Sequence, residues 1–350
     1  MKLDDFINQT GQWLKGIGPN SDIVMSSRIR LARNLDKTPF PNRSDKKSLE
    51  EVAASVQSVM KKIDLLKNAV FFKMSSLDNI DKQFLIERHL MSHEHASHGQ
   101  GKALVVSKEE ILSIMVNEED HLRIQVMQSG LNLYETWNII DAVDTELAKR
   151  LHFAFSREWG YLTACPTNTG TGMRGSVMLH LPALVMTKQI NKVLAAISKL
   201  SFASRGFYGE GTQSSGNFFQ ISNQVSLGSS EDEILQNING LIRQVIEQEE
   251  QARQALLVQN RPMITDKICR SHGILINAHI ISSEETAELL SMVRLGIDVG
   301  IIKKVDKAAI NELFLMIQPA HLQKIEGKKL SAAERDAKRA NLIREKLGGK

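Results

Sequence analysis

The spacing of apolar residues changes several times along the chain, and each change predicts a different element. Short blocks with strand-like alternation lie at 70–74, 103–106, 111–116, 122–126, 177–181 and 218–225. Apolar residues recur with helical spacing at 3–14, 49–66, 83–90, 141–155 and 232–257. Pro182 suits the first turn of one more helix, whose apolar face runs from Met186 to Ile197. Strands and helices mixed in this way are typical of an α+β protein.

The pattern changes after residue 260. Helical spacing dominates there, with one strand-like block at 273–277, and the chain ends in a basic helix. The stretch 258–263, VQNRPM, contains the turn-forming residues expected of a linker. We therefore predict two domains, an α+β domain at 1–255 and a mostly helical domain at 256–350. The segment 23–32 and its neighbours are too basic to predict an ordinary strand.

Composition narrows the class of protein. The chain has 350 residues, of which 42% are hydrophobic, so it has enough apolar material for a large core. Two cysteines, Cys165 and Cys269, exclude a disulfide scaffold and an all-cysteine zinc site. The net charge of +4 suits an anionic ligand without predicting nucleic acid. No apolar run approaches the ~20 residues of a membrane span, and the acidic start MKLDD does not match a signal peptide, so we expect a soluble cytoplasmic protein.

A glycine-rich loop, GTGMRGSV at 170–177, matches two phosphate-binding fingerprints as a string. A dinucleotide loop opens a helix and is followed ~20 residues later by an acid. Here a strand pattern follows, and no Asp or Glu occurs from 159 through 209. The HRD and DFG motifs of protein kinases and the GK[ST] ending of a Walker loop are also absent from the sequence. On this motif alone, a flexible connection and a phosphate-binding loop are equally good interpretations.

Arginines near glycines, serines and acidic turns form a second signal. They are Arg28, Arg30, Arg123, Arg174 and Arg205. The planar guanidinium fork suits phosphate oxygens and stays charged. If these side chains converge near glycine amides, they form a cradle for a polyphosphate. For the lysines of the acid-free span, a solvated surface is the preferred interpretation.

Three more residues are candidates for chemistry. Glu119 lies within NEEDH at 117–121, where consecutive acids repel and need either a cation or solvent. Glu210 lies between two glycines, which leave it accessible, so two carboxylates from separate loops could clamp a guanidinium or a metal. Cys165 precedes the glycine loop and is either a thiolate that takes part in chemistry or a small buried apolar residue. The histidines between 89 and 98 do not have a standard zinc spacing, so we predict no metal site.

Four motifs in this order resemble those of the phosphagen (guanidino) kinase family: SSRIRLARN from Ser26, NEEDHLRIQ from Asn117, CPTNTGTGMRGSV from Cys165 and RGFYGEG from Arg205. Within the family the chain is most similar to bacterial protein-arginine kinases of the McsB type. The helical domain that precedes the motifs in creatine and arginine kinases has no counterpart before Ser26, and the region after 260 is additional. The resemblance implies an α+β catalytic domain with a central antiparallel sheet flanked by helices, followed by a mostly helical domain.

The resemblance also implies roles by position. Glu119 would grip a guanidinium and act as base, Glu210 would be the second such acid, and Cys165 would contact the guanidinium. Gln220 stands where creatine kinases carry an aspartate, which leaves its role open. The implied nucleotide-binding positions are Ser26, Ser27, Arg28, Ile29, Arg30, His89, Arg123, Arg174, Gly175, Ser176, Val177, Met178, Arg205, Gly206, Phe207, Tyr208, Gly209 and Glu210.

The chemistry of the substrate agrees with these roles. A guanidinium is protonated, with a pKa above ~12, and is therefore a poor nucleophile. Two glutamates can hold it and take its proton as the N–P bond forms. The implied cofactors are ATP and Mg²⁺, with the metal held mainly by the nucleotide phosphates.

The region after 260 carries RDAKRA at 335–340, which matches the RDxxRA motif of McsB-type enzymes. The resemblance implies that Arg335, Asp336, Arg339 and Ala340 bind phosphoarginine and that phosphoarginine proteins activate the enzyme allosterically. It further implies a stress-response role, protein substrates that include the repressor CtsR, the activator McsA, the ClpC–ClpP protease and a homodimer, with no membrane and no direct nucleic acid. Two alternatives stay open: a small-molecule guanidino kinase, and a DNA-binding regulator that uses the basic C-terminal helix.

Overall fold

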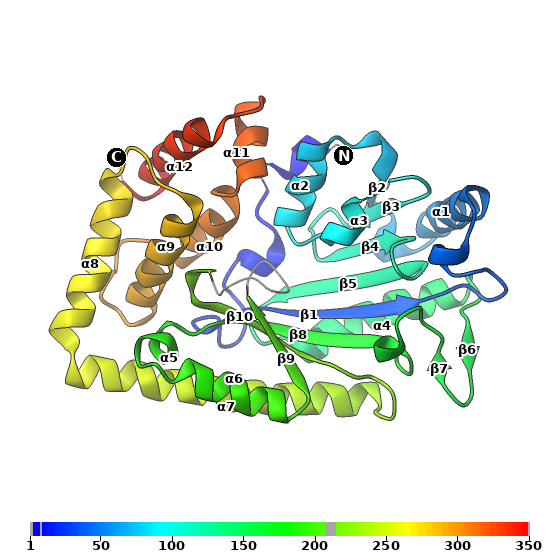
Figure 1. Cartoon of the computed structure of the whole chain (residues 1–350), viewed down its shortest axis with the longest axis horizontal. Coiled ribbons are helices and arrows are strands. Elements are labelled where there is room, and N and C mark those ends of the chain that lie inside the picture. Colours follow the sequence, from blue (N-terminus) through cyan, green and yellow to red (C-terminus); the bar gives the residue numbers. More distant parts are fainter. Residues whose placement is uncertain (1–2, 8, 98, 207–214, 349–350) are drawn as a thin grey trace.

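The computed structural model describes residues 3–7, 9–97, 99–206 and 215–348. In this part of the chain, eight strands form one antiparallel sheet (Figure 1). In spatial order they are β2 (Val70–Lys73), β3 (Ala103–Val106), β4 (Leu112–Val116), β5 (Leu122–Ser129), β1 (Val24–Arg33), β8 (Met173–His180), β10 (Phe218–Asn223) and β9 (Phe202–Gly206). A hairpin of β6 (Phe155–Ser156) and β7 (Gly160–Tyr161) projects at the lower right of Figure 1.

Helices pack mainly on one face of the sheet. They are α1 (Lys46–Met60), α4 (Leu133–Ala148), α5 (Pro182–Met186), α6 (Ile190–Lys199) and α7 (Glu231–Gln259). At the β2 end, α2 (Asn79–Glu87) and α3 (His93–Ala96) lie on the opposite side. Within the described ranges, no helix combines the length and the apolar character needed to cross a bilayer.

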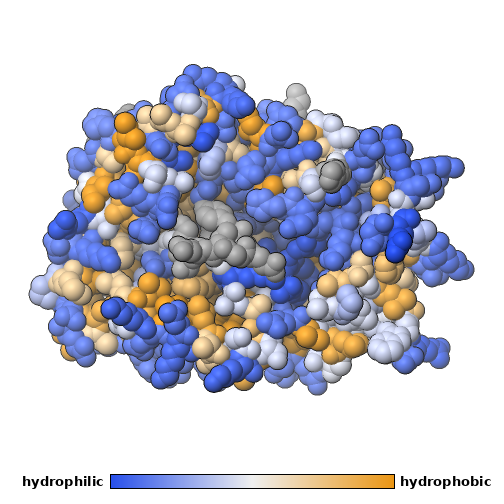
Figure 2. Space-filling view, in the orientation of Figure 1, coloured by the Kyte–Doolittle hydropathy of each residue, from blue (hydrophilic) through white to orange (hydrophobic). Residues whose placement is uncertain are grey.

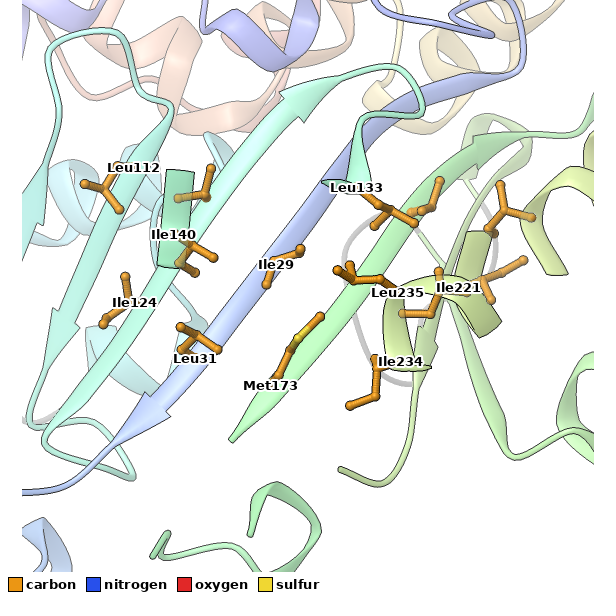
Figure 3. Packing of buried hydrophobic residues seen from close by; sticks show 14 of the residues in the cluster. Ile29, Leu31, Leu112, Ile124, Leu133, Ile140, Met173, Ile221, Ile234 and Leu235 are labelled. Carbon is orange, nitrogen blue, oxygen red and sulfur yellow. The ribbon is translucent and has the colours of Figure 1, made fainter. Parts of the chain in front are cut away.

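Alternation in the central strands separates a core face from a polar face. Ile29 and Leu31 of β1 point into the core, where they lie with residues of β5 and β10 and with α4 and α7 (Figure 3). Burial of each such side chain contributes about 1.5–3 kcal/mol. The intervening residues of β1, Arg28 and Arg30, point to the other face. The strand pattern therefore aims Arg28 and Arg30 at one surface, whereas Arg33, on the face of Ile29 and Leu31, pairs with Asp144 of α4.

Two amphipathic helices of the second half of the chain begin at capping boxes that the sequence encodes. Ser230 accepts a hydrogen bond from the Glu233 backbone N–H at the start of α7, and the Glu233 carboxylate accepts one from the Ser230 backbone. Ser331 and Glu334 make the same exchange at the start of α12 (Ala332–Leu347). This S-x-x-E pattern satisfies donors that a helix start leaves without partners.

The remaining C-terminal helices close one end of the sheet (Figure 1). They are α8 (Arg261–Asn277), α9 (Ser283–Asp298), α10 (Lys307–Met316), α11 (Pro319–Glu326) and α12. Their cluster includes Trp13, Met25 and Phe218, and the rings of Phe218 and Phe314 meet edge-on at 4.9 Å. The predicted fold class, an α+β sheet region followed by a mostly helical region, is confirmed.

Four local predictions were wrong. The region 3–14, predicted as one helix, contains two short 3-10 helices, Leu3–Phe6 and Gln12–Leu14. The segment 23–32 is an ordinary strand, the central β1, because its charged residues all lie on one face. The block 273–277 is the end of α8, where Ile264, Ile268 and Leu275 are buried at helical spacing. The predicted linker at 258–263 is reduced to Asn260, which alone separates α7 from α8.

Candidate active site

The polar face of the central strands carries what we call the arginine cluster: Arg28 and Arg30 of β1, Arg123 of β5, Arg174 of β8 and Arg205 of β9. Residues opposite each other in an antiparallel pair point to the same face. In the β1–β8 pair, Arg30 faces Arg174 and Arg28 faces Ser176. In the β9–β10 pair, Arg205 faces Gln220. Strand register therefore gathers arginines that lie far apart in the sequence.

The arginine cluster lines two adjoining cavities. Arg30, Arg123 and Arg205 border both of them, and the cavity volumes are about 480 and 550 Å³. Cys165 and Glu119 line the first cavity, whereas His89 and Gln220 line the second. Figure 2 shows that this side of the molecule is hollowed and that hydrophilic residues line the hollow.

Mutual repulsion makes the cluster electrostatically unfavourable as it stands. Burial, followed by repulsion from Arg123, Arg174 and Arg205, lowers the pKa of Arg28 to about 9. Burial and the neighbouring arginines also lower the pKa of Arg30, to well below its usual value. The buried Nε of Arg30 has no hydrogen-bond partner among the described residues. Buried donors and converged positive charges of this kind suit a multiply charged anion.

The acidic turn between β4 and β5 gives its carboxylates different positions. Glu118 accepts hydrogen bonds from Arg123, whose Nη1 lies 2.8 Å from each carboxylate oxygen, and from the Ser92 hydroxyl. Burial would raise the pKa of Glu118, but Arg123 and the bond from Ser92 outweigh it and hold that pKa below its usual value. Asp120 accepts from Asn34 at 2.6 Å and from the Ala164 backbone at 2.7 Å, which ties the turn to the Cys165 loop.

Glu119 is the exposed acid of this turn, and it lines the first cavity together with Glu118 and Asp120. Burial, and then the like charges of Asp120 and Glu118, raise its pKa. A carboxylate with a raised pKa is a stronger base once it is ionised. Cys165 lines the same cavity, and its Sγ lies 3.0 Å from the Thr167 hydroxyl. The predicted base and the predicted thiol thus share one cavity with the arginine cluster.

His89 lies between the second cavity and the core. Its backbone has a φ of 57°, a left-handed conformation that few non-glycine residues adopt. Trp13 packs edge-on against its ring at 5.3 Å, and both residues line a small hollow with Arg28 and Met178. Burial and then Arg28 lower the pKa of His89 to about 3, so the imidazole is neutral at physiological pH.

The glycine loop is built for close backbone contact. A Cβ on Gly172 would lie 2.7 Å from the Ala32 carbonyl oxygen, and a Cβ on Gly175 would lie 2.6 Å from Ile238. The Gly175 amide donates to the Asn223 side chain at 2.8 Å, so this amide already has a hydrogen-bond acceptor within the protein. The glycines therefore allow β8 to pack against β1 and α7.

Not every predicted nucleotide-binding position faces the cavities. Ser26, Arg28, Ser176 and Met178 line the small hollow beside His89. Ile29 and Val177 are buried in the core on the opposite face, so their side chains do not line the cavities. Ser27 donates to the Gly130 carbonyl instead. Gly206 ends β9. Four predicted positions lie outside the described residues: Phe207, Tyr208, Gly209 and Glu210.

The RDxxRA motif lies on α12, and its side chains contact the protein. Arg339 is 2% exposed and donates to the carbonyls of Ile317 at 2.9 Å and Ile281 at 2.8 Å, as well as to Asp336. Arg335 is half-buried and donates to the Leu330 carbonyl at 2.9 Å. Ala340 is fully buried.

Some cavity residues escaped prediction from the sequence. Glu118 belongs to the acidic turn, but only the folded structure reveals its pairing with Arg123. Trp13 and Gln318 reach the cavities from the N-terminal segment and from the start of α11, more than a hundred residues from the nearest catalytic motif in the case of Gln318. Neither residue lies in a motif that could have identified it.

Comparison with known proteins places the chain in a family. Residues 51–252 match the ATP:guanido phosphotransferase C-terminal catalytic domain, and residues 261–350 match the protein-arginine kinase McsB C-terminal domain. The protein-arginine kinase of Halothermothrix orenii is 51% identical over 348 residues, which is 99% of each chain. That of Symbiobacterium thermophilum is 48% identical over 339 residues, or 96% of each chain.

Solved structures share the fold. A duplicated taurocyamine kinase from Schistosoma mansoni, solved with transition-state analogue components, is 26% identical with a TM-score of 0.61, covering 67% of this chain and 34% of that one. A lombricine kinase is 24% identical with a TM-score of 0.59, covering 73% of this chain and 77% of that one. The chain is thus a kinase of the ATP:guanido phosphotransferase class and belongs to the protein-arginine kinase family within it.

Proposed function

We propose that this kinase transfers the γ-phosphoryl group of ATP to the guanidino group of arginine side chains in proteins. The observation that carries the proposal is the shared cavity, in which Glu119 and Cys165 lie on the wall next to Arg30, Arg123, Arg174 and Arg205. A carboxylate and a thiol suit a guanidinium, and converging guanidinium groups suit a polyphosphate. One cavity therefore has the right chemistry for both reactants of a phosphoryl transfer.

Glu119 would orient the arginine substrate and take its proton. The attacking guanidino nitrogen forms a bond to the γ-phosphorus while the bond from phosphorus to the bridging oxygen of ADP breaks, and the proton released from nitrogen passes to the Glu119 carboxylate. Its raised pKa favours this transfer. Glu210, the second proposed acid, lies outside the described residues. Cys165 would add an electrostatic contact to the guanidinium, without a covalent phosphoenzyme.

The arginine cluster would hold the phosphates of ATP and neutralise charge that builds up during transfer. Trp13, His89 and Met178 line a hollow of only about 20 Å³ next to Arg28 on the same face, which is room for a water molecule. The neutral His89 adds no further positive charge to this face. Mg²⁺ would bind mainly to the nucleotide phosphates and supply further charge neutralisation.

We also propose that residues 1–255 form the catalytic domain and that residues 256–350 form a domain that binds phosphoarginine. Arg335 supports this because it is only half-buried and donates to the Leu330 carbonyl, with no carboxylate among its hydrogen-bond acceptors in the described part of the chain. Activation by phosphoarginine proteins, a cytoplasmic stress-response role, a homodimer and association with CtsR, McsA and ClpC–ClpP stay predictions from the family resemblance. The alternative of a small-molecule guanidino kinase is addressed by the substrates tested below.

The test is incubation with Mg²⁺, ATP and an arginine-rich protein. The expected product is an acid-labile phosphoramidate on arginine, formed faster on the protein than on free arginine. Glu119→Gln should reduce the rate by about 10²–10⁴-fold while ATP still binds. Glu50→Gln, a matched change of a 59% exposed side chain on α1, should have no effect. Transfer to free arginine alone, or near wild-type activity of Glu119→Gln, would refute the proposal.

A further inference from the structure

A hollow on the outer side of the glycine loop has exposed apolar walls. Its volume is about 420 Å³, and it is lined by the β6–β7 hairpin, by Gly170 and Thr171, and by the segment 226–231. Three large apolar side chains at this hollow face water: Phe155 is 59% exposed, Trp159 is 49% exposed and Leu227 is 43% exposed. Grouped exposed apolar residues of this size are typical of a binding surface.

The backbone joins this hollow to the catalytic cavity. A Cβ on Gly160 would lie 2.4 Å from the Gly170 carbonyl oxygen, and a Cβ on Gly170 would lie 2.8 Å from the Leu227 Cα. The hairpin, the glycine loop and the 226–231 segment are therefore packed backbone against backbone. Thr167, which lines the catalytic cavity with Cys165, accepts a hydrogen bond from Ser226 through its carbonyl. The two hollows lie on either side of one short, tightly held segment.

Hydrogen bonds and ring contacts hold the β6–β7 hairpin in place. The Tyr161 backbone N–H donates to the Gly170 carbonyl at 2.8 Å. The Arg33 guanidinium lies over the Tyr161 ring at 3.5 Å, and Phe155 meets that ring edge-on at 5.3 Å. Phe155 is thus held in place on its inner side while its outer side faces solvent. An apolar side chain held in this way loses little conformational entropy when it binds a partner.

The hollow carries negative charge of its own. Glu158 and Glu231 line it, whereas the nearby Asp144 is compensated by its ion pair with Arg33. The described lining residues of the hollow include no lysine or arginine. A ligand that combines apolar and basic side chains therefore complements this surface.

We propose that this hollow docks the polypeptide of a protein substrate beside the arginine that is phosphorylated. An apolar side chain of the substrate packs against Phe155, Trp159 and Leu227, and a second basic side chain pairs with Glu158 or Glu231. The inference rests on the proposed protein-arginine kinase activity. It explains how an enzyme whose catalytic cavity accepts one guanidino group gains affinity for a protein: the surrounding chain binds on the far side of the glycine loop.

The test compares two peptides, each with a single arginine flanked either by Gly and Ser alone or by Leu and Lys as well. Wild type should favour the second peptide by about tenfold or more in kcat/KM, with the gain in KM, as expected for the burial of one apolar side chain. Phe155→Ser/Trp159→Ser should lose this preference and retain its rate on the Gly/Ser peptide. Glu158→Lys is a second and independent variant. It should lose the share of the kcat/KM preference that comes from the lysine of the second peptide.

Leu65→Ser/Val258→Ser provides the control, because both side chains are exposed apolar residues away from the hollow, at 53% and 73%. It should keep the preference. An equal preference in wild type and in Phe155→Ser/Trp159→Ser overturns the docking site, as does the absence of any preference in wild type. So does a change from dimer to monomer in the hairpin variant by light scattering, which would show that a second copy of the chain occupies the surface. Failure of the kinase proposal is distinct, since wild type would then phosphorylate no arginine in a protein.

Discussion

Buried arginines occur in two settings in this molecule, and their partners differ. Arg33, Arg88, Arg294 and Arg339 are each no more than 2% exposed and are bonded to carbonyls, carboxylates or amides of the chain. The arginine cluster on the sheet instead has other arginines among its nearest charges. The first group holds segments of the fold together, whereas the second group places positive charge where a ligand can bind.

Arg33 illustrates the first setting. Its Nε and Nη2 donate to Asp144 on α4, the Nη2 bond being 2.8 Å, and its Nη1 donates to the carbonyls of Ala32 and Thr171 at 2.9 Å. A buried charge is tolerable when geometry and hydrogen bonds compensate the loss of hydration. Arg33 thus ties β1, α4 and the glycine loop together.

Arg30 illustrates the second setting. It lies on the same strand, three residues earlier, yet its Nε has no hydrogen-bond partner among the residues described, and burial and the neighbouring arginines lower its pKa. Such a side chain destabilises the fold until an anion binds. Residue type alone does not separate the two roles, but the charges within reach do.

The largest expected effect is on catalysis. Arg30→Met should reduce kcat/KM for ATP by about 10³-fold or more, because a transition-state arginine contributes on that scale. Its melting temperature should be equal to or above that of wild type, because repulsion with Arg28 and Arg174 is relieved. Arg270→Met is the control, since Arg270 is 75% exposed on α8. A clear fall in melting temperature with little loss of activity would assign Arg30 to the first setting.

Arg33→Met should give the opposite result. Removal of one partner of a buried ion pair costs about 3–5 kcal/mol, because the remaining charge, here Asp144, is left buried without its partner. Urea unfolding measures this loss of stability. A loss below about 1 kcal/mol would mean that Arg33 does not hold the fold, and the comparison would fail.

Glu87 is connected to the buried Arg88 by hydrogen bonds through His321. Its ionisation should make the stability of this part of the fold depend on pH. Burial raises its pKa to about 7, although the N–H groups of Ala320 and His321 donate to it and act in the opposite direction. A carboxyl whose pKa is raised on folding stabilises the fold below its unfolded pKa of about 4.3, and this contribution is lost as pH rises through the folded value.

The free energy of unfolding should therefore fall between pH 5 and pH 8 by up to about 3 kcal/mol from this group, since one pKa unit is worth about 1.4 kcal/mol. Glu87→Gln, which cannot ionise, should be less stable overall and should lack this part of the fall. Urea unfolding at several pH values, with Glu50→Gln as control, measures the difference. Parallel profiles for wild type and Glu87→Gln would contradict the assignment.

The smallest expected effect separates the two arginines of α12. Arg335→Ala should weaken binding of a phosphoarginine peptide by about 10–100-fold and leave unfolding unchanged, because a hydrogen bond to a charged group contributes about 1.5–3 kcal/mol. Arg339→Ala should mainly lower stability, since the Ile281 and Ile317 carbonyls lose their donor. Titration calorimetry with the peptide measures the affinity of each variant. Equal affinity of Arg335→Ala and wild type would contradict a phosphoarginine-binding site at Arg335.

The sequence predicted the site best where motifs with suitable side chains follow one another in the order found in the family. The motifs around Arg30, Glu119, Cys165, Arg174 and Arg205 point to one site, and these residues do line one cavity. Motifs are segments, however, and a strand sends alternate residues to opposite faces. For this reason, Ile29 and Val177 belong to the matching motifs although their side chains lie on the core face.

The remaining features depend on tertiary structure. Charge obscured the alternation of β1, and the apolar run at 273–277 fits a strand as well as a helix until its spacing with Ile264 and Ile268 is considered. Trp13 and Gln318 reach the cavities only because segments distant in sequence pack together. Pairing between strands, which sets Arg30 against Arg174, cannot be deduced from either strand by itself.

The shift in strand pairing near the start of β1 limits which mutations this strand can accept. Pairing with β8 shifts between Val24 and Ser26, so that Val24 packs in the core although Ser26, two residues later, lies on the polar face. From Ser26 onward, the assignment of residues to faces depends on a strict count. Deletion or insertion of a single codon within 26–33 would place arginines in the core and isoleucine and leucine in the catalytic cavity. This strand can therefore evolve by substitution, whereas a change of length by one residue would remove the core and the active site together.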